Sequence, residues 1–163
     1  MDIVCTKCSY YMIEGVEFQE IISHNDDRGF FREIIRYDNQ FVDGGIKQIS
    51  HSLVYTGVIK AWHLHKVQTQ WNYVLNGLIF TALHDLRKDS KTFGKTISFL
   101  TGDNQKPIAY KFPPGVAHGY KCINGPMNIL YMTSGIYDIN DELRIEFDNE
   151  EIGFNWINIP KIR

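Results

Sequence analysis

Two histidines one residue apart, His63 and His65, have the types and spacing in this chain that most directly suggest chemistry. They lie in the stretch GVIKAWHLHK, residues 57–66, which is otherwise rich in strand-forming residues. Because side chains alternate across a strand, both imidazoles face one side together with Ile59 and Ala61. Three interpretations fit such a pair: a proton-transfer pair, two ligands of a metal ion, or two core histidines held by hydrogen bonds.

The elements that position this pair are predicted to be strands. Runs rich in Ile, Val, Tyr, Phe and Thr, separated by turn residues, cover 46–54, 57–65, 70–75, 78–86, 95–100, 107–112, 119–124 and 128–137. Asn76 and Gly77 separate two of these runs, and such a pair readily takes the positive φ angles of a tight hairpin turn. Short strands at regular spacing predict an all-β sandwich or barrel, here of jelly-roll type.

The segment from Asp138 onward is acidic and irregular, but it keeps large apolar side chains. These are Phe147, Ile152, Phe154 and Trp156. Apolar residues of this size must pack against something, so we expect a short helical or irregular cap. The cap would lie against the barrel mouth or against a second subunit.

Length and composition limit the classes of function. A chain of 163 residues that is 44% hydrophobic predicts one globular domain, residues 1–163. The net charge of −2 offers no basic excess for nucleic acid or an anionic membrane, which favours a small-molecule partner.

The start MDIVCTKC lacks the features of a signal peptide, and no apolar run reaches transmembrane length, so a cytoplasmic protein is expected. Three cysteines are too few for a disulfide framework, and we interpret Cys5 and Cys8 as reduced thiols rather than a zinc site.

The histidine pair and its neighbours resemble the first motif of the cupin family, G-x5-H-x-H-x3-4-E-x6-G. Here the motif is carried by Gly57, His63, His65, Gln70 and Gly77, with glutamine in place of glutamate. PPGVAHGY, residues 113–120, resembles the second cupin motif around His118. The resemblance implies a jelly-roll barrel. A metal set of His63, His65, Gln70 and His118 stays open, although a neutral amide is a poorer ligand than a carboxylate.

Four stretches resemble a narrower cupin group, the nucleotide-sugar epimerases related to dTDP-4-dehydrorhamnose 3,5-epimerase. They are DDRGFFRE at 26–33, GVIKAWH at 57–63, DLRKDSKTFGK at 85–95 and PPGVAHGY at 113–120, and residues 130–149 fit the same group. The resemblance implies a homodimeric isomerase that needs neither metal nor cofactor. It implies epimerisation at C3, C5 or both of a dTDP-, CDP- or GDP-linked 4-keto-(6-deoxy)hexose, in deoxysugar and polysaccharide biosynthesis.

By this resemblance His63 removes a proton beside the sugar ketone, and Tyr131 returns one on the opposite ring face. Such chemistry needs a base of near-neutral pKa and a stabilised enolate oxygen. The resemblance further implies a set of substrate-binding residues: Arg28 and Lys60 at the pyrophosphate or enolate, Phe31 and Glu33 from a neighbouring subunit, Gln48 at base or sugar, His65 beside the base, Gln70 where a lysine is common, His118 near the pyrophosphate and Tyr137 stacked on the ligand. Lys60 and His63 are three residues apart, so a regular strand would send them to opposite faces unless it carries a bulge.

The chain departs from this pattern around the base. The family supports its histidine with carboxylates, but Thr81 stands where one is common and the chain ends at Arg163 before the usual C-terminal aspartate. We therefore expect a backbone carbonyl to orient His63, or His65 to share its work. The run from His63 to Lys66 also resembles the sugar-nucleotide 3,4-ketoisomerases, in which two histidines shuttle protons on one face. Ketoisomerase, metal-binding cupin and non-catalytic sugar-nucleotide binder remain the alternatives.

Overall fold

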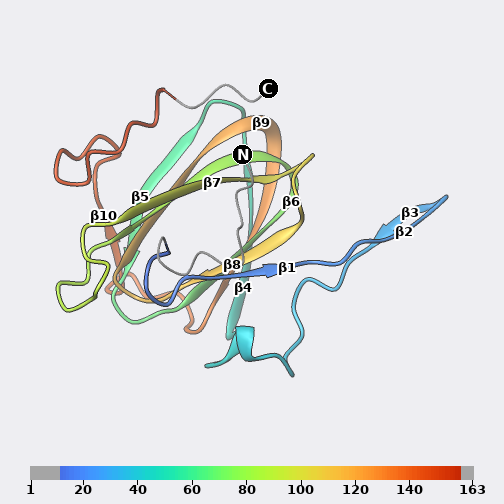
Figure 1. Ribbon diagram of the computed structural model, residues 1–163, viewed down its shortest axis with the longest axis horizontal. Coiled ribbons are helices and arrows are strands. Elements are labelled where there is room, and N and C mark those ends of the chain that lie inside the picture. Colours follow the sequence, from blue (N-terminus) through green and yellow to red (C-terminus); the bar gives the residue numbers. More distant parts are fainter. Residues whose placement is uncertain (1–11, 159–163) are drawn as a thin grey trace.

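The computed structural model describes residues 12–158, and this part of the chain is almost entirely β (Figure 1). Strands hydrogen-bond into one sheet of eight and one of two. The elements are β1 Glu17–Glu20, β2 His24–Asp26, β3 Gly29–Phe31, the short 3-10 helix η2 Gln40–Val42, β4 Gln48–Val54, β5 Ile59–His65, β6 Gln70–Asp85, β7 Thr96–Gly102, β8 Ile108–Phe112, β9 Val116–Thr133 and β10 Glu142–Arg144. The prediction of an all-β fold is confirmed.

Two long strands, β6 and β9, form the spine of the large sheet. They pair antiparallel along almost their whole lengths, and each changes its outer neighbour part of the way along. The first half of β6 pairs with β8 and its second half with β7, while β9 pairs first with β5 and then with β4. The sheet therefore curls over itself, and Figure 1 shows β5 and β7 facing β8 across the interior.

The predicted hairpin at Asn76 and Gly77 is wrong. β6 continues without a turn through this pair, and its ladder with β9 shifts register on both sides of Asn76. Gly77 does take a positive φ of 82°, and a Cβ there would lie 2.7 Å from the carbonyl oxygen of Asn124. The glycine allows an irregularity inside a bent strand, at the place where β6 exchanges β8 for β7. The runs at 119–124 and 128–137 likewise join, because β9 spans the first of them and most of the second.

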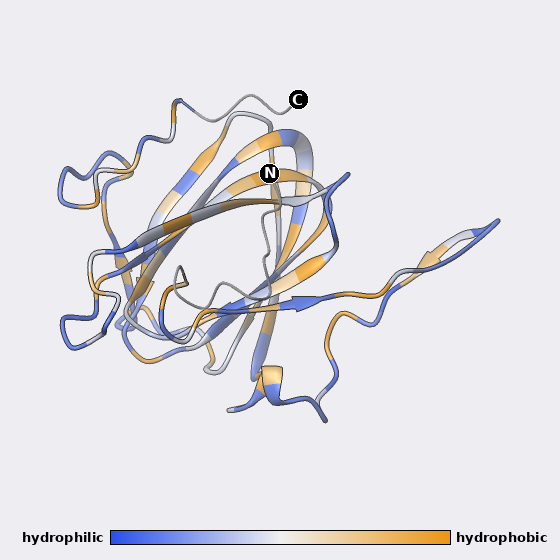
Figure 2. Ribbon diagram, viewed as in Figure 1, coloured by the Kyte–Doolittle hydropathy of each residue, from blue (hydrophilic) through white to orange (hydrophobic). Residues whose placement is uncertain are grey.

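Apolar side chains fill the space between the layers, and Figure 2 shows apolar and polar residues alternating along several strands. One cluster joins β6, β7 and β8 through residues such as Leu83, Phe99 and Tyr110. Others lie beneath η2 and along β9. Burial of these side chains supplies the main driving force that fixes the strands around the interior.

The C-terminal segment packs as a cap without a helix: residues 134–158 contain β10, turns and irregular chain. Ile152 and Trp156 are buried against Trp62 of β5, with the Trp62 and Trp156 ring centroids 4.9 Å apart. The predicted packing of the tail is confirmed for Ile152, Phe154 and Trp156, whereas Phe147 is 41% exposed. The cap takes the irregular form of the prediction, not the helical one. No helix among residues 12–158 is long and apolar enough to cross a membrane.

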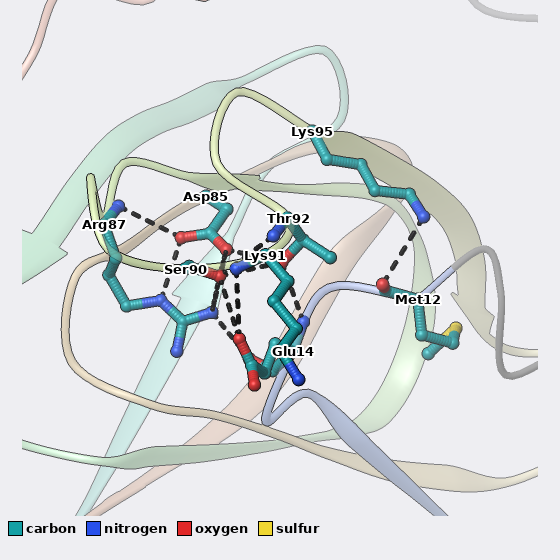
Figure 3. Close-up of polar contacts among 8 residues, drawn as sticks. All are labelled: Met12, Glu14, Asp85, Arg87, Ser90, Lys91, Thr92 and Lys95. Carbon is teal, nitrogen blue, oxygen red and sulfur yellow. Dashed lines mark hydrogen bonds and ion pairs between the residues drawn. The ribbon is translucent and has the colours of Figure 1, made fainter.

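A polar network centred on Asp85 fastens the N-terminal segment to the loop after β6 (Figure 3). The fully buried Asp85 carboxylate accepts hydrogen bonds from Arg87 Nε and Nη2 at 2.8 Å each and from the hydroxyls of Ser90 and Thr92 at 2.6 Å. Arg87 also donates to the carbonyl oxygen of Glu14 at 2.6 Å. Burial alone would raise the pKa of Asp85, but these donors hold it well below its usual range. The stretch DLRKDSKTFGK thus contains a structural clamp.

Candidate active site

A cavity of about 290 Å³ lies within the curled sheet. Seven of the predicted site residues line it: Lys60, His63, His65, Gln70, His118, Tyr131 and Tyr137. They come from β5, β6, β9 and the segment after β9. The structure therefore brings together the histidine pair and the predicted tyrosine, which are 68 residues apart in the chain when counted from His63 to Tyr131 (131 minus 63).

A β-bulge in β5 lets Lys60 and His63 face the same cavity although they are three residues apart. The ladder between β5 and β9 shifts register between these two residues, so both side chains reach the same cavity. Gly119 permits this close approach, because a Cβ at its position would lie 2.4 Å from Ala61 Cβ and 3.0 Å from the Lys60 carbonyl oxygen. Lys60 Nζ donates to Ser52 Oγ at 3.0 Å.

His63 is hydrogen-bonded to a carboxylate, so the expectation of a backbone carbonyl as its orienting partner is wrong. Its Nδ1 lies 2.9 Å from Glu142 Oε1. Burial lowers the pKa of His63 below its ordinary value, and the Glu142 carboxylate opposes this shift without overcoming it. Glu142 comes from β10, which pairs with β5. With Nδ1 engaged by Glu142, Nε2 is the ring nitrogen left for a substrate.

His65 and His118 extend the row of imidazoles. The His118 ring lies 6.0 Å from the His63 ring and 5.6 Å from the His65 ring, measured between centroids, with interplanar angles of 32° and 22°. His65 Nδ1 lies 3.2 Å from Asp141 Oδ2, without the alignment of a hydrogen bond. Burial holds the pKa of His118 well below its ordinary value, and the two neighbouring histidines add to the effect. Within residues 12–158, no three His, Cys, Asp or Glu side chains are arranged to hold a metal ion.

Two tyrosines of β9 face the cavity as a hydrogen-bonded pair. The hydroxyls of Tyr120 and Tyr131 are 2.5 Å apart. Burial raises the pKa of Tyr131 above its ordinary value, so the phenol keeps its proton at neutral pH. The Tyr137 backbone nitrogen donates to Gln48 Oε1 at 2.7 Å, so Gln48 holds the segment that carries Tyr137 without lining the cavity itself.

The deep end of the cavity is neutral and polar. Gln70 Nε2 donates to Asn72 Oδ1 at 2.8 Å, and Asn72 Nδ2 donates to the Tyr110 hydroxyl at 3.0 Å. Gln70, Asn72 and Thr81 are all at most 4% exposed. Thr81 Oγ1 is buried without a hydrogen-bond partner among the described residues. These groups offer donors and acceptors to an uncharged polar ligand.

Three predicted residues lie outside the cavity, on or beside the β2–β3 hairpin, which projects far from the main sheet (Figure 1). Phe31 is 64% exposed and the Arg28 side chain is 84% exposed. Arg28 forms an ion pair with Asp26 of its own hairpin, and Glu33 Oε1 lies 3.6 Å from Arg36 Nη1. Cys5 and Cys8 fall outside the described residues.

Sequence reasoning missed Glu142 and Arg144, which both line the cavity. The alternation in DELR would have placed the two on one face of a strand, but three residues bounded by irregular chain are a weak strand signal. The same reasoning missed Ser50, Asn72, Tyr110, Gly119, Tyr120 and Thr133. Most of these belong to runs predicted as strands, and only the pairing of distant strands shows that they face the cavity.

Comparison with known proteins finds the same family that the sequence motifs resemble. The model of the dTDP-4-dehydrorhamnose 3,5-epimerase family matches residues 11–162. The spore coat polysaccharide biosynthesis protein SpsL of Bacillus subtilis is 43% identical over 148 residues, covering 89% of this chain and 97% of the relative. The dTDP-4-dehydrorhamnose 3,5-epimerase of Escherichia coli is 28% identical over 157 residues, covering 88% of this chain and 81% of the relative.

Solved structures agree on the fold. A dTDP sugar isomerase from Desulfovibrio desulfuricans has a TM-score of 0.83 and 25% identity, covering 91% of this chain and 94% of that chain. The epimerase of Legionella pneumophila in complex with dTDP-4-keto-L-rhamnose has a TM-score of 0.82 and 22% identity, covering 93% and 83%. The predicted cupin jelly-roll class is confirmed by these likenesses.

Proposed function

The chain belongs to the dTDP-4-dehydrorhamnose 3,5-epimerase family, and we propose that it inverts C3, C5 or both of a nucleotide-linked 4-keto-6-deoxyhexose through proton transfer at His63. It is an isomerase of the epimerase class in deoxysugar biosynthesis. The observation that carries the proposed mechanism is the pair formed by His63 Nδ1 and Glu142 Oε1 at 2.9 Å inside the cavity.

His63 would act as the base. A C–H bond beside a ketone is broken when a positioned base of near-neutral pKa accepts the proton. Hydrogen-bonded through Nδ1, the ring presents Nε2 to the substrate and becomes imidazolium when it takes the proton. The Glu142 carboxylate stabilises that charge and fixes the ring, as the aspartate of the serine-protease triad does for its histidine in a different reaction.

Tyr131 would supply the returning proton. Its phenol is protonated at neutral pH because burial raises its pKa, and the Tyr120 hydroxyl fixes its position. His63, on β5, lies opposite His118 in the first half of β9, whereas Tyr131 lies in the second half of β9. The base His63 and the acid Tyr131 therefore approach a bound sugar from different elements. Proton removal on one side and return on the other is what inversion requires. Lys60 is placed to balance the charge of the enolate or the pyrophosphate.

The β2–β3 hairpin supports a homodimer. Arg28, Phe31 and Glu33 are exposed and lie away from the cavity of their own chain, so they would contribute to nucleotide binding in the cavity of a second copy. A Phe31→Ala variant that binds dTDP as tightly as the parent, or a monomer by analytical ultracentrifugation, would contradict this arrangement. We further propose a cytoplasmic location, which the low cysteine content favours.

The substrate is proposed to carry dTDP, with the product entering polysaccharide synthesis. The family description names a dTDP-linked sugar, and the 43% identical relative is a spore coat polysaccharide biosynthesis protein.

The test incubates the protein with dTDP-4-keto-6-deoxyglucose in D2O and follows deuterium by NMR. We expect deuterium at C3, C5 or both in the parent protein and none in His63→Ala. CDP- and GDP-linked analogues are run in parallel. Absence of exchange with all three nucleotides would overturn the proposal.

Ketoisomerisation is the second candidate, because His65 lines the same cavity two residues from the base. It would begin with the same proton abstraction and return the proton to the neighbouring carbon. In the same NMR experiment, a ketone that migrates from C4 to C3 would identify this reaction.

A further inference from the structure

Arg144 is a cation of the cavity that the mechanism above leaves unused. Its Nε donates to Glu142 Oε1 at 3.0 Å, and this same oxygen accepts the hydrogen bond from His63 Nδ1 at 2.9 Å. Within residues 12–158, its terminal nitrogens Nη1 and Nη2 make no hydrogen bond with protein. Arg144 Nε therefore binds Glu142, the partner of His63, while Nη1 and Nη2 remain able to donate to a ligand.

The backbone places Arg144 firmly beside the base. In the pairing of β10 with β5, Arg144 lies opposite His63 and Glu142 lies opposite His65. Reciprocal backbone hydrogen bonds between Trp62 and Ile145, at 2.9 and 3.0 Å, close the ladder directly after Arg144. The side chain is 77% exposed, so the guanidinium lies at the rim of the cavity rather than in its depth.

The chemistry of the cavity changes from its depth to its rim. The buried end presents neutral groups such as Gln70, Asn72 and Thr81, which suit the hydroxyls and ketone of a sugar. Among the described residues, Lys60 and Arg144 are the lysine and arginine that line the cavity. A diphosphate loses much hydration free energy when buried, so it belongs at the exposed end, where a guanidinium can replace part of its water.

We propose that Arg144 binds the diphosphate of the nucleotide sugar through Nη1 and Nη2 while its Nε stays on Glu142. The charged end of the substrate and the base His63 are then connected through one carboxylate oxygen. This inference rests on the proposed function and adds a residue that sets the preference for a diphosphate-linked sugar. The planar guanidinium matches two phosphate oxygens at once, and its attachment to Glu142 reduces the freedom lost on binding.

The groups around His63 make this coupling specific to Arg144. The titratable and charged groups that surround His63 are Glu142 and Arg144 on β10, Lys60 and His65 on β5, and His118 on β9. Of these, only Arg144 shares the carboxylate oxygen that accepts from His63. A diphosphate that neutralises the guanidinium leaves the negative charge of Glu142 more fully to the imidazole.

Binding of dTDP, measured by isothermal titration calorimetry, tests the anion contact without turnover. Arg144→Ala should weaken dTDP binding about 10- to 100-fold, the range expected for a charge-assisted hydrogen bond. Arg144→Lys should recover part of the lost affinity for dTDP, because lysine keeps the positive charge but lacks the two parallel N–H donors of a guanidinium. Lys106→Ala is the matched control, because Lys106 is a cation as exposed as Arg144, is also paired with a carboxylate, that of Glu20, and lies outside the cavity. An affinity of Arg144→Ala within about twofold of the parent overturns the anion contact, since loss of one such hydrogen bond exceeds that factor.

A double-mutant cycle between Arg144 and Glu142 tests the coupling. The fold loss in kcat caused by Arg144→Ala should be smaller in a Glu142→Gln background than in the parent. Equal losses in the two backgrounds overturn the coupling. The proposed function fails separately: its failure appears as a parent protein that neither binds dTDP nor exchanges deuterium, whatever residue stands at 144.

Discussion

Replacing Glu142 with glutamine keeps the shape of the partner of His63 and removes its charge. The imidazolium that forms during proton abstraction then loses a charged acceptor at 2.9 Å. The Glu142 side chain is only 15% exposed, so solvent screens this interaction little. A hydrogen bond to a charged group contributes about 1.5–3 kcal/mol, and about 1.4 kcal/mol corresponds to a factor of ten in rate. We therefore expect kcat/KM to fall about 10- to 100-fold.

The pH profile of this variant gives an independent check. Burial lowers the pKa of His63 and the Glu142 carboxylate opposes that shift, so removing the charge lowers the pKa further. The acidic limb of the kcat/KM profile, where the base becomes protonated as pH falls, should move to lower pH while the plateau drops. Deuterium wash-in to dTDP-4-keto-6-deoxyglucose, followed by NMR from about pH 5 to pH 9, measures both effects across the range in which histidine titrates.

The exposed Glu146, in the same segment, provides the control as Glu146→Gln. A Glu142→Gln variant that matches this control in rate and in the position of the acidic limb would refute the role of Glu142. A fall in rate without any movement of the limb would show that Glu142 orients the ring without tuning its basicity.

Three further changes test the clamp, the strand contact and the proposed acid. Asp85→Asn should lower the free energy of unfolding in urea by about 3 kcal/mol, because it leaves the Arg87 guanidinium beside a buried neutral group. The parent should also lose stability as pH falls below the ordinary pKa of aspartate toward the depressed pKa of Asp85, and the variant should lose less, because only carboxylates such as Asp141 and Glu142 then contribute. Gly119→Ala should cost about 1–3 kcal/mol and lower kcat, since its Cβ would lie 2.4 Å from Ala61 Cβ and force β5 outward. Tyr131→Phe should retain deuterium exchange and yield little inverted product in NMR; full inversion would remove Tyr131 as the acid.

The fold class followed from local sequence, and the cavity residues named in advance followed from the family resemblance. The strand runs carry strong β propensity, and the spacing of His63, His65 and His118 matched motifs that are independent of long-range geometry. The hairpin at Gly77 failed because a positive φ serves a tight turn and an irregular strand equally well. Local composition gives no means of deciding between them, since the choice depends on the partner strands: β6 pairs with β9 on both sides of Gly77.

The carboxylate partner of His63 was unpredictable for a related reason. Glu142 is 79 residues away from His63, and it reaches the base only because the three residues of β10 add to the edge of β5. Beyond β10 the tail packs Trp156 and Ile152 against Trp62 of β5, which helps to hold β10 at that edge. Ile152, Phe154 and Trp156 of the tail were correctly expected to pack, and their packing also determines which acidic residue meets the histidine. The stability of the cap and the basicity of His63 are thus linked through one short strand, so loosening the cap should weaken the base.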